Sequence, residues 1–353
     1  MLTVGIDAHD RLYVMCVLDE QGKTFKEHTV RGGPEAVAAW IKGLGGGARA
    51  CYEASLGYGM LHDALTGAGV PTQVAHPAHL RSIWQSKKKN DRIDAHKLAT
   101  MLYLDRVPRV HVPSMPVREW RVLIEHRRRL VDKRTATKNG LRALLRSHAI
   151  AAPKGRRLWF GPGKKWLGGV GFASPLAALR RDQLLEELEH FDRMIKAAER
   201  ALDQIGDRHP GVALLRTMPG VGPRTSEAVV AYVDDPRRFG STRRAASYFG
   251  LVPCLDQSAG VKRLGHITRQ GPATVRKLLV EAAWQGIRHS PSLRRMFDRI
   301  KGGRKEQTGR ALVATARHMV QAMVAMLKSG QEWHEQEQEP PAGRPAQPVT
   351  AAA

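Results

Sequence analysis

The chain is short of cysteine and of long apolar runs, and each of these shortages excludes a class of protein. Three cysteines in 353 residues, none in a Cys-x-x-Cys spacing, argue against a disulfide scaffold and against a zinc finger. No apolar stretch approaches the roughly 18 residues that a membrane-spanning helix needs. The N-terminal sequence MLTVGIDAHD has no signal-peptide pattern. We therefore expect a cytoplasmic protein that makes no membrane contact.

Positive charge, by contrast, is abundant. Lys and Arg number 57 against 33 Asp and Glu, a net charge of +24. Residues 1–328 alone hold 56 basic and 29 acidic residues, so the net charge of this part is +27. A compact chain with this charge repels itself unless a polyanion is bound, which favours a nucleic-acid partner.

Residues 1–112 are predicted to form an α/β domain. Short β-branched runs alternate with segments whose apolar residues recur at helical spacing. This order favours a mixed sheet covered by helices. The expected strands span 2–6, 12–18, 23–30, 49–54 and 70–75, and the expected helices span 34–44 and 58–69.

The rest of the chain is predicted to be mainly helical. Residues 113–208 are basic and contain a loop or linker at 151–175 and an unbroken heptad pattern within 182–205. The heptads indicate either a helix packed on its own domain or a coiled coil that joins two protomers. Residues 209–328 are expected to form a mostly α-helical domain with a loop at 253–272. Residues 329–353 contain few large apolar residues and are expected to be a disordered tail.

Four carboxylates occupy positions that the predicted strands and helix do not need for their own stability. Asp7 in VGID and Glu53 in ACYEAS occupy predicted strands, where a buried charge is unfavourable unless it is paired or binds metal. Asp91 and Asp94 lie three residues apart at a helix start and therefore share one helical face. Together they predict a site for two Mg²⁺ ions, which Mn²⁺ can replace, suited to phosphodiester displacement.

Each of these residues also has an ordinary structural explanation. Asp7 can begin a turn, Glu53 can pair with an arginine, and Asp91 can cap a helix. His9 adjoins the first motif and is expected to be a hydrogen-bonding neighbour rather than a catalyst.

The segments GIDAHD, YEAS and KNDRIDAHKLA resemble the four-carboxylate (DEDD) set of the RuvC-like, RNase H-like domain in transposases of the insertion sequence 110 family. Two long segments that begin MPGVGPRTSEAVV and QSAGVKRLGHITRQG resemble the C-terminal transposase domain of the same family. The motifs follow the family's order and cover residues 1–110 and 210–290. The resemblance implies catalytic and metal-ligating roles for Asp7, Glu53, Asp91 and Asp94.

The resemblance also implies a nucleophilic serine that forms a phosphoserine link to DNA. The matching residue is Ser258 in DQSAGVKR, and Gly260 after it permits close approach of the backbone to a phosphate. The family commonly has two glycines after the serine, whereas Ala259 occupies the first of these positions here. A serine beside a glycine in a loop is otherwise ordinary.

Contacts to nucleic acid are predicted at a turn and at clustered basic residues. The sequence PGVG resembles a helix–hairpin–helix turn, whose N–H groups would bind a DNA phosphate without reading sequence, although a plain tight turn is the alternative. Many Lys and Arg contacts imply steep salt dependence of binding. The predicted contact residues are Gly220, Gly222, Arg224, Arg127, Arg128, Arg129, Lys262, Arg263 and Arg269, of which the last three would also offset transition-state charge at the serine.

As the resemblance implies, the protein would be a bacterial DNA transposase of the nucleoid, guided by a structured non-coding bridge RNA that pairs with donor and target DNA. It would act as a homo-oligomer, a dimer that forms a tetramer in the active complex, with carboxylates of one protomer meeting Ser258 of another. Two alternatives remain open. The first is a metal-only RuvC-like nuclease such as a junction resolvase, in which Ser258 is structural. The second is a non-catalytic nucleic-acid-binding relative.

Overall fold

The computed structural model describes residues 1–335 apart from 46, 56, 84–89, 154–157 and 259–260. The chain divides after Met115 into two compact units. Within the described ranges, no helix combines the length and the apolar character that crossing a membrane requires.

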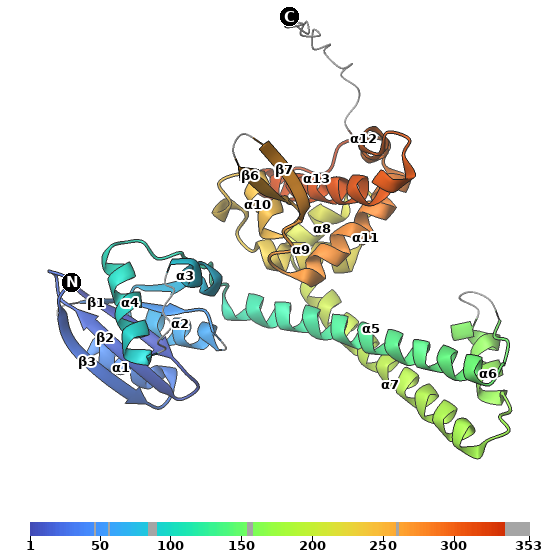
Figure 1. The fold of residues 1–353 in the computed structure, drawn as a ribbon, viewed down its shortest axis with the longest axis horizontal. Helices are drawn as coiled ribbons and strands as arrows, with labels where there is room; N and C mark the ends of the chain where they lie inside the picture. The colour runs from blue at the N-terminus through green and yellow to red at the C-terminus, as the bar shows by residue number, and fades with distance from the viewer. Residues whose placement is uncertain (46, 56, 84–89, 154–157, 259–260, 336–353) are drawn as a thin grey trace, which may run out of the picture. The chain divides into compact units, whose positions relative to one another are not determined.

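The first unit is built on a five-stranded sheet with the order β3-β2-β1-β4-β5 (Figure 1). β1 (Leu2–Ala8) pairs antiparallel with β2 (Leu12–Leu18), which pairs antiparallel with β3 (Thr24–Arg31). β1 also pairs parallel with β4 (Ala48–Glu53), and β4 pairs parallel with β5 (Thr72–Ala75). The expected mixed α/β sheet is confirmed.

Helices cover both faces of this sheet. α1 (Pro34–Lys42) and α2 (Tyr58–Gly67) pack on the face that carries Val4, Ile6 and Tyr52. α3 (Pro77–Ile83) follows β5, and α4 (Asp91–Tyr103) packs on the opposite face through Ala95 and Ala99. Because side chains alternate along each strand, successive residues contribute to the apolar cores on opposite faces of the sheet.

A glycine brings α4 directly onto β1. A Cβ atom at Gly5 would lie 2.0 Å from the carbonyl oxygen of Ala95 and 2.3 Å from the backbone nitrogen of Ala99. Any other residue at position 5 would therefore push the helix away. This close packing sets how near the start of α4 lies to the end of β1.

Two long helices run antiparallel in the second unit. α5 (Met115–Ser147) and α7 (Pro175–Gly206) lie side by side, and α6 (Gly161–Gly169) sits at their connected end (Figure 1). Leu188, Ile195 and Leu202 of the predicted heptad pattern are buried. The pattern therefore packs within the chain, where ion pairs along the two helices join α7 to α5.

The remaining elements of the second unit surround one large core. Trp120 and Ile124 of α5 and Leu202 of α7 belong to this core, which therefore includes residues on both sides of position 208. A β-hairpin also lies in the segment that we expected to be a loop. The elements are α8 (Pro210–Arg216), α9 (Pro223–Val233), η2 (Pro236–Arg238), α10 (Thr242–Tyr248), β6 (Pro253–Ser258), β7 (Val261–Ile267), α11 (Ala273–His289), α12 (Pro291–Lys301), η3 (Lys305–Gln307) and α13 (Thr308–Ser329).

The first residues of the expected tail are packed rather than free. The backbone nitrogen of Trp333 donates to Thr217 Oγ1 at 3.0 Å, and its side chain packs against the core. The backbone nitrogen of Ser292, in the first turn of α12, donates to Glu335 Oε2 at 3.1 Å. Trp333 and Glu335 of the expected tail therefore contact the second unit in this structure.

We predict that a chain ending at Gly330 is less stable than a chain ending at Glu335 by about 1–3 kcal/mol, because it loses a helix cap and an apolar contact. Urea unfolding of the two truncated chains measures the difference. Both lack residues 336–353, so the comparison isolates the packed segment. Equal unfolding midpoints would contradict the prediction.

Candidate active site

Two carboxylates lie at the same edge of the sheet. The parallel pairing of β1 with β4 runs from Leu2 opposite Ala48 to Ile6 opposite Tyr52. Asp7 and Glu53 are the next residue on each strand. Because side chains alternate between the two faces, both point to the face that α4 covers. The sheet register therefore brings together residues that are 46 positions apart in the sequence.

The start of α4 adds two more carboxylates. Asn90 caps this helix, and its side chain accepts a hydrogen bond from the backbone nitrogen of Arg92 at 3.0 Å. Asp91 is the first residue of the helix, and Asp94 lies one turn later, where Lys97 Nζ donates to Asp94 Oδ1 at 3.0 Å. The positive end of the helix dipole favours negative charge here.

His9 lies between two of the carboxylates. His9 Nε2 is 3.4 Å from Asp7 Oδ2 and 3.4 Å from Asp91 Oδ2. One ligand atom from each of the three residues lies within 4.8 Å of the other two, a separation that suits a shared metal ion. Sequence reasoning had treated His9 only as a neighbour, although its position two residues after Asp7 was a usable signal.

Electrostatics links all four predicted carboxylates. Burial raises the pKa of Asp7, His9 lowers it, and the charges of Asp91, Asp94 and Glu53 each raise it further. Glu53 and Asp94 therefore lie within electrostatic reach of Asp7, although they are outside the closest trio. Like charges in this arrangement repel one another, and a bound divalent cation would relieve the repulsion.

Ser258 is the last residue of strand β6. Its backbone pairs with Val261 of β7 next to the turn of the hairpin. At the opposite end, which we call the base of the hairpin, Pro253 lies opposite Ile267. Ala259 and Gly260 lie outside the described residues, as do the side chains of Ser258, Lys262 and Arg263. Arg269 follows the hairpin with an exposed side chain and a φ of 54°.

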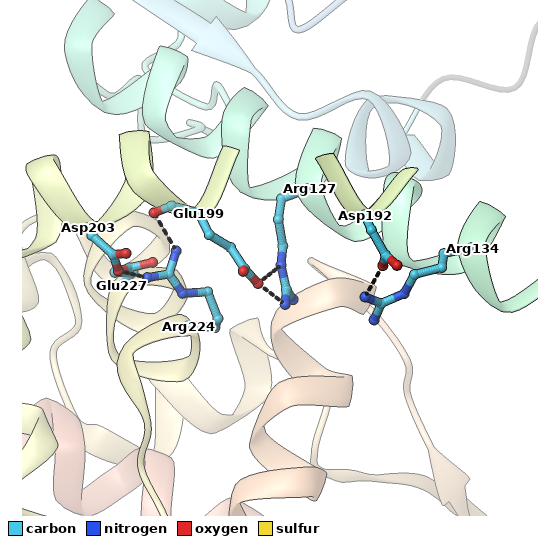
Figure 2. Close-up of polar contacts among 7 residues, drawn as sticks. All are labelled: Arg127, Arg134, Asp192, Glu199, Asp203, Arg224 and Glu227. Carbon is cyan, nitrogen blue, oxygen red and sulfur yellow. Dashed lines mark hydrogen bonds and ion pairs between the residues drawn. The ribbon is translucent and has the colours of Figure 1, made fainter. Parts of the chain in front are cut away.

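Three of the predicted nucleic-acid contacts are engaged within the chain. Figure 2 shows Arg127 of α5 reaching Glu199 of α7, with two hydrogen bonds of 2.5 and 3.0 Å. Arg224 of α9 pairs with Asp203 of α7 and with Glu227 of its own helix. Arg128 pairs with Asp132 on α5 at 3.1 Å, whereas Arg129 is exposed. The paired arginines join or stabilise helices in this structure.

Glu227 has an unusual environment among these pairs. Its side chain is 2% exposed, and Oε2 has no hydrogen-bond partner in the described part of the chain. Burial raises the pKa of Glu227 from 4.5 to about 7, although Arg224 opposes this change. The folded protein therefore retains a proton that the unfolded chain releases. The stability linked to this proton is complete below the unfolded pKa and is lost as the pH rises through about 7.

We predict that Glu227→Gln loses less stability than the natural protein between about pH 5 and pH 8, because the amide cannot ionise. Thermal unfolding at the two pH values measures this difference. Glu186→Gln, an exposed position on α7, is the matched control and should follow the natural protein. An identical pH dependence for Glu227→Gln would show that the buried carboxyl does not titrate in this range.

The two glycines of the PGVG turn have different roles. Gly220 has a φ of 86°, and a Cβ atom there would lie 2.3 Å from the backbone nitrogen of Gly286 in α11. Packing therefore requires glycine at this position. Gly222 precedes α9, and a Cβ atom there would have no atom within 4 Å. The side of the turn at Gly222 is open to a ligand.

Comparisons with known proteins agree across both units. Residues 4–150 match a family model described as Transposase, of the DEDD type found in IS110 elements, and residues 212–298 match one described as the IS116/IS110/IS902 transposase family. The chain is 27% identical over 290 residues to the transposase for insertion sequence element IS1111A of Coxiella burnetii, covering 81% of this chain and 78% of that protein.

Two further relatives are similar over shorter ranges. A protein named probable family 20 transposase of Pseudomonas aeruginosa is 30% identical over 206 residues, which cover 57% of this chain and 61% of the relative. The transposase for insertion sequence element IS1328 of Yersinia enterocolitica is 26% identical over 221 residues, which cover 61% of this chain and 64% of the relative. The chain thus spans less than two thirds of these two proteins.

Proposed function

Since the two family matches identify the chain as an IS110-family transposase, we propose that it cuts and rejoins DNA strands by joint use of its carboxylate site and Ser258. The sheet order of the first unit supports an RNase H-like, RuvC-like domain for the carboxylates. Asp7, Glu53, Asp91 and Asp94 would hold Mg²⁺ or Mn²⁺, with His9 close enough to contribute. The bound ion would supply charge stabilisation to phosphoryl oxygens.

The single observation that carries this proposal is the convergence at Asp7. Burial, Asp91 and Asp94 at the start of α4, and Glu53 at the end of β4 all raise the pKa of the Asp7 carboxyl at the end of β1. His9 and Asp91 lie within reach of an ion shared with Asp7. Oxygen-rich ligand sets suit Mg²⁺ and Mn²⁺. If these carboxylates had only a structural role, the repulsion among their negative charges would destabilise the fold with nothing to offset it.

Ser258 would provide the covalent step. Its oxygen would bond to phosphorus while the leaving oxygen of the cut strand takes up a proton, and a hydroxyl of another strand would later reverse the step. The stored phosphoester would allow rejoining without an external energy source. We propose further that a structured RNA selects donor and target DNA, and that protomers assemble so that the carboxylates of one reach Ser258 of another.

Recombination in cells tests the proposed function. We expect expression of the chain, in a bacterium whose plasmid carries the DNA flanking the gene, to yield new DNA junctions that sequencing detects. Glu53→Gln should yield none, whereas Glu35→Gln, an exposed carboxylate on α1, should match the natural protein. Junctions formed equally by Glu53→Gln would overturn the role of the carboxylates. Cutting without junctions would favour the metal-only nuclease.

A further inference from the structure

A hollow of about 690 Å³ opens in the second unit between the base of the β6–β7 hairpin and α13. Figure 1 shows this hairpin beside α13. We call this feature the α13 hollow. Its volume lies in the range of small-molecule sites, which are commonly about 300–1,000 Å³. The residues that matter for its chemistry are Leu251, Ile267, Val313, His266, Arg310 and Arg317.

One wall of the α13 hollow is apolar. Leu251 is buried in the main core, and Val313 packs against that core from α13. Ile267 ends strand β7 on the hairpin side. A flat apolar group entering the hollow would therefore meet a wall that the core already holds in position.

Two arginines add positive charge to the lining of the hollow. Arg310 and Arg317 are seven residues apart on α13, so they lie on one helical face about 10 Å apart along the axis. Within the described residues, neither guanidinium group forms an ion pair with a carboxylate. This differs from Arg127 and Arg224, whose charges are neutralised inside the chain.

The surroundings of the hollow are also basic. Residues 294–317 contain eight Lys and Arg against two acidic residues, and α13 itself contains no Asp or Glu. Burial lowers the pKa of His318, and the neighbouring charges of Arg299 and Arg317 lower it further. The positive potential here attracts an anion.

The combination of an apolar wall and two guanidinium groups that have no carboxylate partner among the described residues matches the chemistry of a nucleotide. A base would pack on the wall while the adjoining phosphates contact the arginines. Bases in a duplex are stacked inside the helix, so only an unpaired nucleotide can place its base in a hollow. We propose that the α13 hollow binds an unpaired nucleotide of a DNA strand, with the base against Ile267 and Val313, beneath which Leu251 is buried, and the phosphates on Arg310 and Arg317.

This assignment rests on the proposed function, because it takes DNA as the ligand. It also specifies where a DNA strand would lie on the second unit. The hollow includes the hairpin base at Pro253, and Ser258 ends the same strand five residues later. An extended strand of that length spans about 17 Å. A DNA strand held in the hollow can therefore run along the hairpin toward Ser258.

Binding of labelled single-stranded oligothymidylate, measured by fluorescence anisotropy in EDTA, tests the proposal. We expect the natural protein to bind this probe about tenfold more tightly than the same oligonucleotide made of abasic residues, because a stacked base contributes to affinity. Ala314→Phe should fill the hollow, bring the ratio close to one and leave abasic binding unchanged, since Ala314 lines the same space.

A second variant tests the phosphate contacts independently. Arg310→Gln with Arg317→Gln should weaken binding of both oligonucleotides and reduce the logarithmic salt slope by about one to two, as expected for two lost phosphate contacts on a single strand. Arg180→Gln with Arg200→Gln removes the same charge from exposed positions on α7 and should leave the base-to-abasic ratio unchanged. Thermal unfolding of each variant verifies folding.

Three results would overturn the proposal. They are a base-to-abasic ratio near one for the natural protein, an unchanged ratio in folded Ala314→Phe, and an unchanged salt slope in the double arginine variant. Tighter, Arg310-dependent binding of oligouridylate than of oligothymidylate would assign the hollow to RNA and overturn its assignment to DNA. Because the assay contains no metal and no cleavage step, failure of the carboxylate site would not affect its outcome.

Discussion

Asp7→Asn, Asp91→Asn and Asp94→Asn are each expected to reduce metal-dependent DNA cleavage by at least about 100-fold. Loss of a residue that only supports a metal ligand already reduces activity or metal affinity by about 10- to 100-fold, and a direct ligand contributes more. The expectation follows from the geometry around Asp7, where Asp91 and His9 lie within reach of one ion. Gel analysis of cleaved DNA in Mg²⁺ and in Mn²⁺ measures the effect.

Stability measurements separate this effect from misfolding. Burial and the neighbouring carboxylates raise the pKa of Asp7, so its ionised form is unfavourable in the metal-free folded protein. Stability linked to its proton is present below the unfolded pKa and is lost as the pH rises through the folded pKa. In EDTA at neutral pH, Asp7→Asn should therefore unfold at the same or a higher temperature than the natural protein.

Added metal should make the natural protein unfold at a higher temperature than Asp7→Asn. Mg²⁺ or Mn²⁺ is expected to raise the unfolding temperature of the natural protein, because ligands that bind only the folded state stabilise it. Asp7→Asn should gain little, and Glu35→Gln should gain as much as the natural protein. Retention of metal-dependent cleavage by all three Asp→Asn variants would refute the carboxylate site.

Ser258→Ala is expected to eliminate the covalent protein–DNA adduct and strand transfer. An alanine methyl group cannot attack phosphorus, and Ser258 at the end of β6 is the nucleophile that we propose. The measurement is mass spectrometry of protein trapped on a suicide DNA substrate, which locates the modified residue. The natural protein should show one DNA-linked peptide that contains Ser258.

Ser247→Ala is the matched control, because Ser247 is exposed on α10 of the same unit. It should form the adduct as the natural protein does. If Ser258→Ala still cuts DNA in Mg²⁺ at the natural rate and no adduct forms in either protein, the chain acts as a metal-only nuclease. Loss of all binding by Ser258→Ala would instead indicate that the hairpin has unfolded.

Local patterns predicted much of the first unit. Short β-branched runs marked β1 and β2, and a further strand was expected at β4. Charged residues within these expected strands marked Asp7 and Glu53. A helix start was expected at Asp91 and Asp94, and α4 begins at Asp91. His9 was underestimated because a lone histidine after a strand has many ordinary roles, and only the folded start of α4 places Asp91 beside it.

The second unit was less predictable. Residues 253–267 contain Pro, Gly and several charges, so a loop was expected where β6 and β7 pair. The pairing depends on cross-strand contacts that single-strand propensity does not report. Likewise, the Gly- and Lys-rich segment at α6 is helical because Leu158 and Leu167 bury with Leu145 in a small core of their own.

The sequence by itself determined the chemical repertoire of this protein: four carboxylates at distinctive positions, a serine within a recognisable motif, and a large excess of positive charge. Only the tertiary structure decided which arginine side chains are available to bind a ligand. Arg127 and Arg224 lie near carboxylates from distant parts of the chain and are neutralised, whereas Arg310 and Arg317 lie on a helix without acidic residues and border a hollow. Charge compensation depends on separation in space, and separation along the chain does not report it.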